Sequence, residues 1–152
     1  MDIPKLKEEI NSDPLGRGYS AMDDAAVAAS LNTADRSRVV ELSSAKLLAW
    51  SAGASAGDRP RLIKIDEASQ SHASEEVKAA ALISAEMVRR DGTSIDLNLA
   101  DHMGLLDGLV AGGVLSSADK TDLLQLATES ISRATELGLG LVRPGDVIQA
   151  RM

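Results

Sequence analysis

The pattern with the clearest chemical meaning in the sequence is Gly-Ala-Ser-Ala-Gly at residues 53–57. It matches G-x-S-x-G, in which a strained turn from a strand into a helix exposes a nucleophilic serine above a sheet. The preceding residues, 46–52, instead predict a helix, and the general base would have to be His72 or His102. Since Ala, Gly and Ser are also ordinary turn residues, we interpret Ser55 as part of a turn and predict that the chain is not an enzyme.

Two other patterns are typical of ligand sites. Asp101-His102 offers two metal ligands, but zinc sites need about three or four closely spaced ones, and the other histidine, His72, is distant in sequence. Gly16-Arg17-Gly18 offers backbone N–H groups to a phosphate, but no strand is predicted before it. We interpret the first pattern as a surface histidine near a helix start and the second as a turn. The sequence therefore predicts no metal, no cofactor and no small-molecule substrate.

The charge balance argues against nucleic acid as a partner. The chain of 152 residues holds 16 Lys and Arg against 23 Asp and Glu, which gives a formal net charge of −7. Such a surface repels a phosphate backbone. The densest basic cluster is Arg59, Arg61 and Lys64, which we interpret as the solvated start of a helix.

Cysteine usage and hydropathy exclude further classes of protein. The chain has no Cys, which rules out a disulfide scaffold, thiol catalysis and a Cys-ligated zinc site. No apolar run reaches the roughly 18 residues of a membrane span. Residues 1–10 contain acids and lack the apolar stretch of a signal peptide. We therefore expect no membrane partner, and a chain that stays in the cytoplasm in which it is made.

The composition favours an all-α fold. With one Trp, one Tyr and no Phe, the core must consist of Leu, Ile, Val, Met and Ala. Such side chains suit closely packed helices, whereas strands prefer β-branched and aromatic residues. We predict a compact bundle of about six or seven short helices. Residues 39–42 and 95–99 leave open a minor pair of short strands.

Cap residues and helical spacing locate the predicted helices. Asp2 and Ser74 stand where helices should begin, and Ser20 with Asp23 resembles a capping box. The predicted helix at 74–90 is apolar almost all round, which indicates a central, buried helix. The remaining helical segments are 2–11, 20–32, 43–52, 60–71, 99–111 and 116–137, with an open question of a break near 128–130, and a last turn at 144–148.

These elements suggest three parts of the chain. Residues 1–20 form an N-terminal arm of one helix and a loop, residues 21–138 form the helical core domain, and residues 139–152 form a C-terminal segment. The two terminal parts combine short amphipathic stretches with Pro- and Gly-containing loops. We expect both to become ordered on a neighbouring protein.

Three stretches carry a resemblance to a known group of proteins. They are Asp-Pro-Leu-Gly-Arg-Gly-Tyr at 13–19, Leu-Val-Ala-Gly-Gly-Val-Leu-Ser at 109–116, and Ser-Arg-Ala-Thr-Glu-Leu-Gly-Leu at 132–139. In this order they resemble small proteins encoded by tailed bacteriophages and prophages, in or near the genes for virion structure. The resemblance implies a component of the virion or of its assembly, made in the host cytoplasm and then found in the virion. It implies no catalytic residue.

Together, the residues and the resemblance predict a non-enzymatic phage structural or assembly protein. It would act through protein–protein contacts in the capsid, the head–tail junction or the tail, with other virion proteins or with itself. The alternative is a small, acidic, soluble phage protein that binds and inhibits or regulates a host protein. The residues that we expect to bind the partner lie in the two terminal parts: Leu15, Arg17, Tyr19, Val142, Arg143, Val147 and Ile148.

Overall fold

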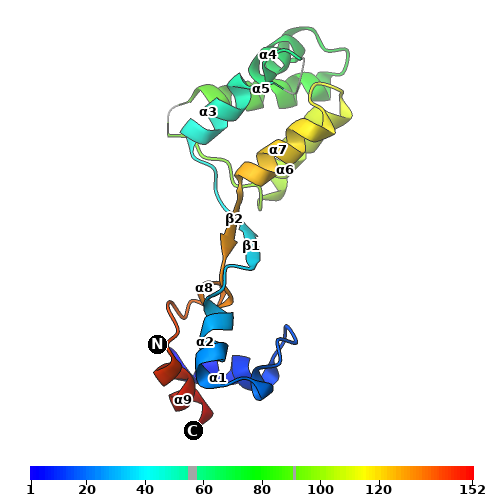
Figure 1. Ribbon diagram of the computed structural model, residues 1–152. Coiled ribbons are helices and arrows are strands. Elements are labelled where there is room, and N and C mark those ends of the chain that lie inside the picture. Colours follow the sequence, from blue (N-terminus) through cyan, green and yellow to red (C-terminus); the bar gives the residue numbers. More distant parts are fainter. Residues whose placement is uncertain (55–57, 91) are drawn as a thin grey trace. The chain divides into compact units, whose positions relative to one another are not determined.

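The computed structural model describes residues 1–54, 58–90 and 92–152 (Figure 1). These residues are mostly helical, with nine α-helices, one short 3-10 turn and two strands, which confirms the predicted fold class. The chain divides into two compact units. The terminal unit consists of Met1–Arg38 and Ser130–Met152, and the central unit consists of Val39–Glu129.

This division differs from the predicted arm, core and C-terminal segment. The structure groups residues 21–38 and 130–138 with the two chain ends, and not with the middle of the chain. The physical reason is burial: apolar side chains from both ends form one shared core, so neither end is an independent arm.

The terminal unit contains α1 (Ile3–Ser12), the 3-10 turn η1 (Tyr19–Ala21), α2 (Asp24–Asn32), α8 (Arg133–Glu136) and α9 (Pro144–Arg151). Helix α9 packs against α1 and α2, and α2 also packs against α8 (Figure 1). The side chains that form its core are Leu6, Ile10, Tyr19, Val27, Ala28, Leu31, Ala134, Leu139, Val142, Val147 and Ala150.

The central unit contains α3 (Ser44–Ala52), α4 (Arg61–Ser71), α5 (Glu75–Arg89), α6 (Ala100–Ala111) and α7 (Ser117–Leu126). Helix α5 packs against α3, α4 and α6, and α6 packs against α7. The buried side chains of this core are Leu42, Leu47, Trp50, Ile65, Ala68, Ala81, Ala85, Val88, Leu97, Leu106, Leu109, Val114, Leu115, Leu123 and Ala127. Among the described residues, no helix is both long and apolar enough to cross a membrane.

A minor strand pair was an open expectation, and the structure contains one. Strands β1 (Arg36–Val39) and β2 (Thr128–Ile131) pair with each other, and the chain passes between the two units within each strand. Strand β2 occupies the predicted break, so the expected helix at 116–137 is split into α7 and α8. In the central unit, Leu42 and Ile95 also form an isolated antiparallel bridge, with N–H···O distances of 2.8 and 3.0 Å.

Some helix starts were predicted correctly from the local sequence, and one was not. As predicted, Asp2 caps α1 and Ser74 caps α5, each by accepting a backbone N–H of the first turn. The predicted capping box at Ser20 is wrong, because α2 begins only at Asp24. Asp23 directly precedes that helix, and its carboxylate accepts the Ala26 N–H at 2.7 Å. A carboxylate is also favoured by the helix dipole at this position.

The prediction that the helix at 74–90 is central and buried is wrong for one side of that helix. Only Ala81, Ala85 and Val88 of α5 are buried. Leu82 and Ile83 are 55% and 49% exposed. The neighbouring helices cover one side of α5, so its other side meets solvent although it carries apolar residues.

Candidate functional site

The loop between α1 and η1 is held by Asp13. This residue adopts a left-handed conformation with φ of 40°, and its carboxylate accepts the N–H groups of Arg17 at 2.8 Å and Gly18 at 2.7 Å. Burial acts to raise the pKa of Asp13, but hydrogen bonds from the Arg17, Gly18 and Tyr19 backbone outweigh it and lower the pKa below its ordinary value. Two backbone N–H groups of the Gly16-Arg17-Gly18 turn are therefore directed at Asp13.

Arg17, one of the predicted partner-binding residues, is engaged within the terminal unit. Its guanidinium donates to the carbonyl oxygen of Ser30 at 2.7 Å and to the carboxylate of Asp35 at 2.7 Å. Only 11% of the side chain is exposed. Arg17 thus fastens the loop onto the C-terminal end of α2 and the residues after it.

Tyr19, Val142 and Val147, also predicted to bind a partner, are buried in the core of the terminal unit. The Val142 backbone is fixed by Asn32, whose side-chain amide donates to the Val142 carbonyl at 2.7 Å and accepts its N–H at 3.1 Å. The Tyr19 hydroxyl is buried without a hydrogen-bond partner among the residues that the structure describes. These three side chains pack the chain ends on each other.

The remaining predicted residues, Leu15, Arg143 and Ile148, lie on the surface of the terminal unit. Leu15 is 37% exposed and Ile148 is 51% exposed. Arg143 precedes α9, and its backbone N–H donates to the carboxylate of Asp146 at 2.8 Å. These three side chains are the part of the predicted set that a partner can reach.

Four charged side chains of the terminal unit form a network that the sequence did not predict. Arg133 makes two hydrogen bonds to Glu9, of 2.8 and 2.7 Å, and one to Glu136 of 2.9 Å. Glu136 also accepts from Arg36 at 3.1 Å. Hydrogen bonds from Arg36 and then from Arg133 hold the pKa of Glu136 below its ordinary value. Only the spacing of Arg133 and Glu136 was visible in the sequence, since Glu9 is distant along the chain.

The basic cluster at 59–64 is not the solvated helix start that the sequence predicted. Arg61 is buried, and its guanidinium donates to the fully buried Asp119 at 2.7 Å and to Asp122 at 2.5 Å. The guanidinium also lies over the Trp50 ring, 5.1 Å from its centre. The Trp50 indole N–H donates to the Asp119 carbonyl at 3.2 Å.

The other two basic residues of that cluster also pair with acids. Lys64 contacts Asp58 at 2.6 Å, and Arg59 contacts Glu67 at 2.6 Å. The hydrogen bond from Lys64 is the main reason why the pKa of Asp58 is lowered. The cluster therefore connects helices and loops of the central unit, and its charge is compensated locally.

Both histidines have structural partners in the central unit. The Nδ1 atom of His72 accepts the Ser74 N–H at 3.0 Å, so its Nε2–H donates to the Gly112 carbonyl at 3.0 Å. The Nδ1 atom of His102 lies 3.1 Å from the backbone of Asp96. Within the described residues, no group of three or more His, Asp or Glu is arranged for a metal ion.

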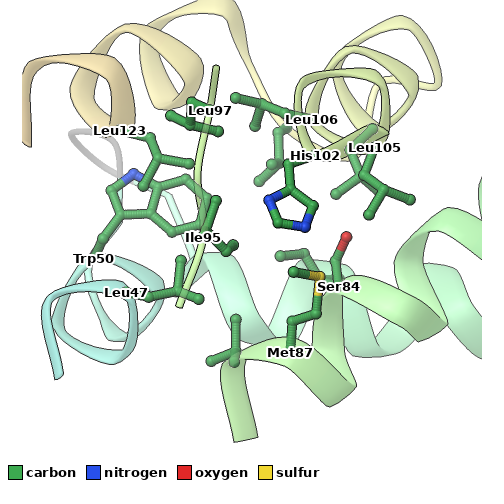
Figure 2. Close-up of a pocket in the computed structure, with 14 residues that line it drawn as sticks. Leu47, Trp50, Ser84, Met87, Ile95, Leu97, His102, Leu105, Leu106 and Leu123 are labelled. Atoms are coloured by element: carbon green, nitrogen blue, oxygen red, sulfur yellow. The ribbon is translucent and has the colours of Figure 1, made fainter. Parts of the chain in front are cut away.

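A small apolar cavity lies inside the central unit, with His102 at its wall (Figure 2). Its volume is about 40 Å³. Pockets for small ligands usually measure about 300–1,000 Å³, so this cavity holds no more than a water-sized group. Its labelled lining residues are Leu47, Trp50, Ser84, Met87, Ile95, Leu97, His102, Leu105, Leu106 and Leu123.

The candidate nucleophile of the G-x-S-x-G pattern, Ser55, lies outside the described residues. The cavity lining includes another serine, Ser84, and a histidine, His102. A serine nucleophile needs its base within hydrogen-bond reach. No hydrogen bond joins Ser84 and His102, which are both described, so their presence in one cavity does not make a catalytic pair.

Comparisons with models of protein families, with curated proteins and with solved structures found no match to this chain. The structure describes the three stretches at 13–19, 109–116 and 132–139. Residues 13–19 and 132–139 fold together in the terminal unit, whereas residues 109–116 belong to the central unit. In the terminal unit these stretches supply Asp13, which holds its own loop, and Arg17 and Arg133, whose side chains contact residues more distant along the chain.

Proposed function

We propose that this chain is a non-enzymatic protein of a tailed bacteriophage or prophage that acts in the virion or in its assembly through protein–protein contacts. The phage assignment comes from the three stretches at 13–19, 109–116 and 132–139. The contact-based mode of action comes from the apolar side chains that both units expose on their helices.

The exposed apolar residues are the observation that carries a contact-based function. In the central unit, Leu82 and Ile83 are neighbours on α5 and are about half exposed. In the terminal unit, Leu141 is 68% exposed and Ile148 of α9 is 51% exposed. Single exposed apolar residues are common, whereas contiguous exposed apolar surface marks sites that bind another protein, and Leu82 and Ile83 are neighbours on α5.

The terminal unit is folded before it meets a partner, which favours binding through protein–protein contacts. Its two chain ends are tied together by Glu9 and Arg133, and by Arg151, which donates to the carboxylate of Asp24 and to the backbone oxygens of Tyr19 and Met22. Such a unit presents Leu15, Ile148 and their neighbours on a folded surface, so little ordering entropy is lost on binding.

Mass spectrometry of purified particles tests this proposal. The particles should come from the phage or induced prophage that encodes the chain, with assembly intermediates collected separately. We expect the chain to co-purify with particles or intermediates at a fixed ratio to the known structural proteins. Its absence from both would contradict the proposal, and recovery with a host protein in a salt-sensitive complex would support the alternative function.

A further inference from the structure

The outward side of α5 carries an ordered series of residue types. From its first turn to its last residues, the exposed positions are acidic, small, apolar, acidic and basic. Residues seven positions apart lie on nearly the same line along a helix. We call this series the α5 stripe, and it consists of Glu76, Ala79, Leu82, Ile83 and Glu86 of α5 and of Arg90, which directly follows the helix.

The stripe is accessible, and among the residues that the structure describes its charged side chains form no ion pairs. Leu82 and Ile83 are 55% and 49% exposed. Within residues 1–54, 58–90 and 92–152, Glu76, Glu86 and Arg90 form no side-chain hydrogen bond or ion pair. A surface depression of about 350 Å³ lies beside the two apolar residues, and Met87 and Thr93 contribute to its walls.

The order of charges makes the stripe complementary to itself. Glu76 and Arg90 stand seven residues before and seven residues after Ile83. In a twofold contact, residue i of one copy meets residue j of the other, and j meets i. If two α5 helices pack antiparallel with Ile83 on the axis, Glu76 of each copy meets Arg90 of the other.

The same arrangement accounts for the apolar and small positions. Ile83 of one copy packs on Ile83 of the other, and Leu82 of each copy enters the depression beside them. Ala79 then faces Glu86 of the second copy, and its small side chain leaves room for that carboxylate. A parallel pairing would instead place Glu76 on Glu76 and Arg90 on Arg90, which like-charge repulsion opposes.

We propose that two copies of this chain associate through the α5 stripe in an antiparallel, twofold contact centred on Ile83. This proposal deepens the proposed function and rests on it for its biological setting, since it names a second copy as one partner. A single pair of helices forms a small interface, so the dimer dissociates on dilution.

Sedimentation equilibrium of the full-length protein over a range of concentrations, near an ionic strength of about 0.15 M, tests this. We expect a reversible monomer–dimer equilibrium for the wild type. Ile83→Asp should place two carboxylates on the axis and leave only monomer. Ile63→Asp is the matched control, because Ile63 lies on α4 and is 45% exposed, and it should dimerise like the wild type.

Charge-reversal variants provide a second, independent test of the dimer. Glu76→Arg or Arg90→Glu alone creates two like-charge contacts per dimer and should weaken dimerisation about tenfold. The double variant restores opposite charges and should recover the wild-type dissociation constant. Circular dichroism establishes that each variant is folded, and if Ile83→Asp is not, the charge reversals decide alone.

Three outcomes would overturn the dimer: a wild type that is monomeric at every concentration, an Ile83→Asp variant that dimerises as well as Ile63→Asp, or a double reversal no better than the worse single one. A monomeric chain that is nevertheless present in virions would remove only the dimer and leave the proposed function standing. A chain that dimerises but is absent from particles and intermediates would contradict the proposed function and leave the dimer standing.

Discussion

The terminal and central units each enclose an apolar core, but they are closed in different ways. The central unit is one continuous segment, Val39–Glu129, whose helices follow one another in sequence. The terminal unit joins residues that are 110 or more positions apart, through Asn32 and Val142, Glu9 and Arg133, and Arg151 and Asp24. The helices of the central unit are connected by one continuous segment, whereas the two chain ends of the terminal unit are joined by a shared apolar core and by polar side-chain contacts.

Because the two units are closed differently, the effect of a substitution in one unit can be compared with its effect on the other. The chain has one Trp and one Tyr, and Trp50 belongs to the central core while Tyr19 belongs to the terminal core. The indole N–H resonance of Trp50 and the ring resonances of Tyr19 therefore report on the two units separately in one NMR sample. A substitution should move the urea midpoint of its own unit and leave the other in place.

The largest effect should come from Asp119 in the central unit. Asp119→Ala removes the carboxylate that faces the buried Arg61 and should lower the free energy of unfolding of that unit by about 3–5 kcal/mol. Trp50 should report the loss and Tyr19 should not. Asp122→Ala is the matched control, since Asp122 pairs with the same Arg61 but has a 51% exposed side chain, and it should cost less than about 1 kcal/mol. Equal shifts of the urea midpoints reported by Trp50 and Tyr19 would show that the two units do not unfold separately.

In the terminal unit, the corresponding substitution is Glu9→Ala. Glu9 is 4% exposed and holds Arg133 by two hydrogen bonds, so its loss should cost about 1.5–3 kcal/mol. The Tyr19 resonances should shift to lower urea and the Trp50 resonance should not. Glu8→Ala changes the exposed neighbour on α1 and serves as the control. Equal effects of Glu8 and Glu9 would contradict the role of the Glu9–Arg133 contact.

Substitutions at Gly104 of α6 and at Gly112, which directly follows that helix, should change the stability of the central unit in opposite directions. A Cβ at Gly112 would lie 2.7 and 2.8 Å from the methyl groups of Val77, so Gly112→Ala should destabilise the unit by about 1–3 kcal/mol. A Cβ at Gly104 meets nothing within 4 Å, so Gly104→Ala should stabilise it by about 0.5–1 kcal/mol. Urea denaturation followed at Trp50 measures both, and equal signs would contradict the close approach of α5 and α6.

The smallest effect should be a difference in acid sensitivity at the terminal unit. Its Glu136 has a pKa held below the ordinary 4.5. A carboxyl group whose pKa is lower in the folded state contributes stability that is present above the unfolded pKa and is lost as the pH falls through the folded pKa.

The urea midpoint of Tyr19 should therefore fall as the pH is lowered below about 5. Glu136→Gln should make that fall shallower, because the amide does not titrate. Asp13 contributes to the same fall, since its pKa is also lowered, so the variant should retain part of the pH dependence. An unchanged slope in Glu136→Gln would show that the Arg36–Glu136–Arg133 contacts do not stabilise this unit.

The local sequence was sufficient to predict most of the helices. Asp2 and Ser74 begin their helices as predicted, since a cap depends only on the next few residues. The ending at Gly138 is also set locally: the φ of Gly138 is 70°, and the Leu139 N–H donates to the Ala134 carbonyl at 2.8 Å. Residues 95–99 alternate between apolar and polar types, which indicated an extended segment, and Ile95 pairs with Leu42 in an isolated bridge.

The partition into two units was not predictable in the same way. Nothing near Arg61 in sequence reveals that its partner is Asp119, and nothing near Glu9 reveals Arg133. The apolar pattern of α5 gives its helical state but not which side its neighbours cover. For the same reason the predicted partner-binding residues contained both exposed side chains, such as Ile148, and core side chains, such as Val147.

The most direct test of the two-unit account is to express residues 39–129 alone. A continuous unit with its own core should fold without the chain ends. We predict a cooperative urea transition, a protected Trp50 indole N–H and the same loss on Asp119→Ala as in the full chain. An isolated segment that is unfolded, with Trp50 exposed and no cooperative transition, would contradict the account.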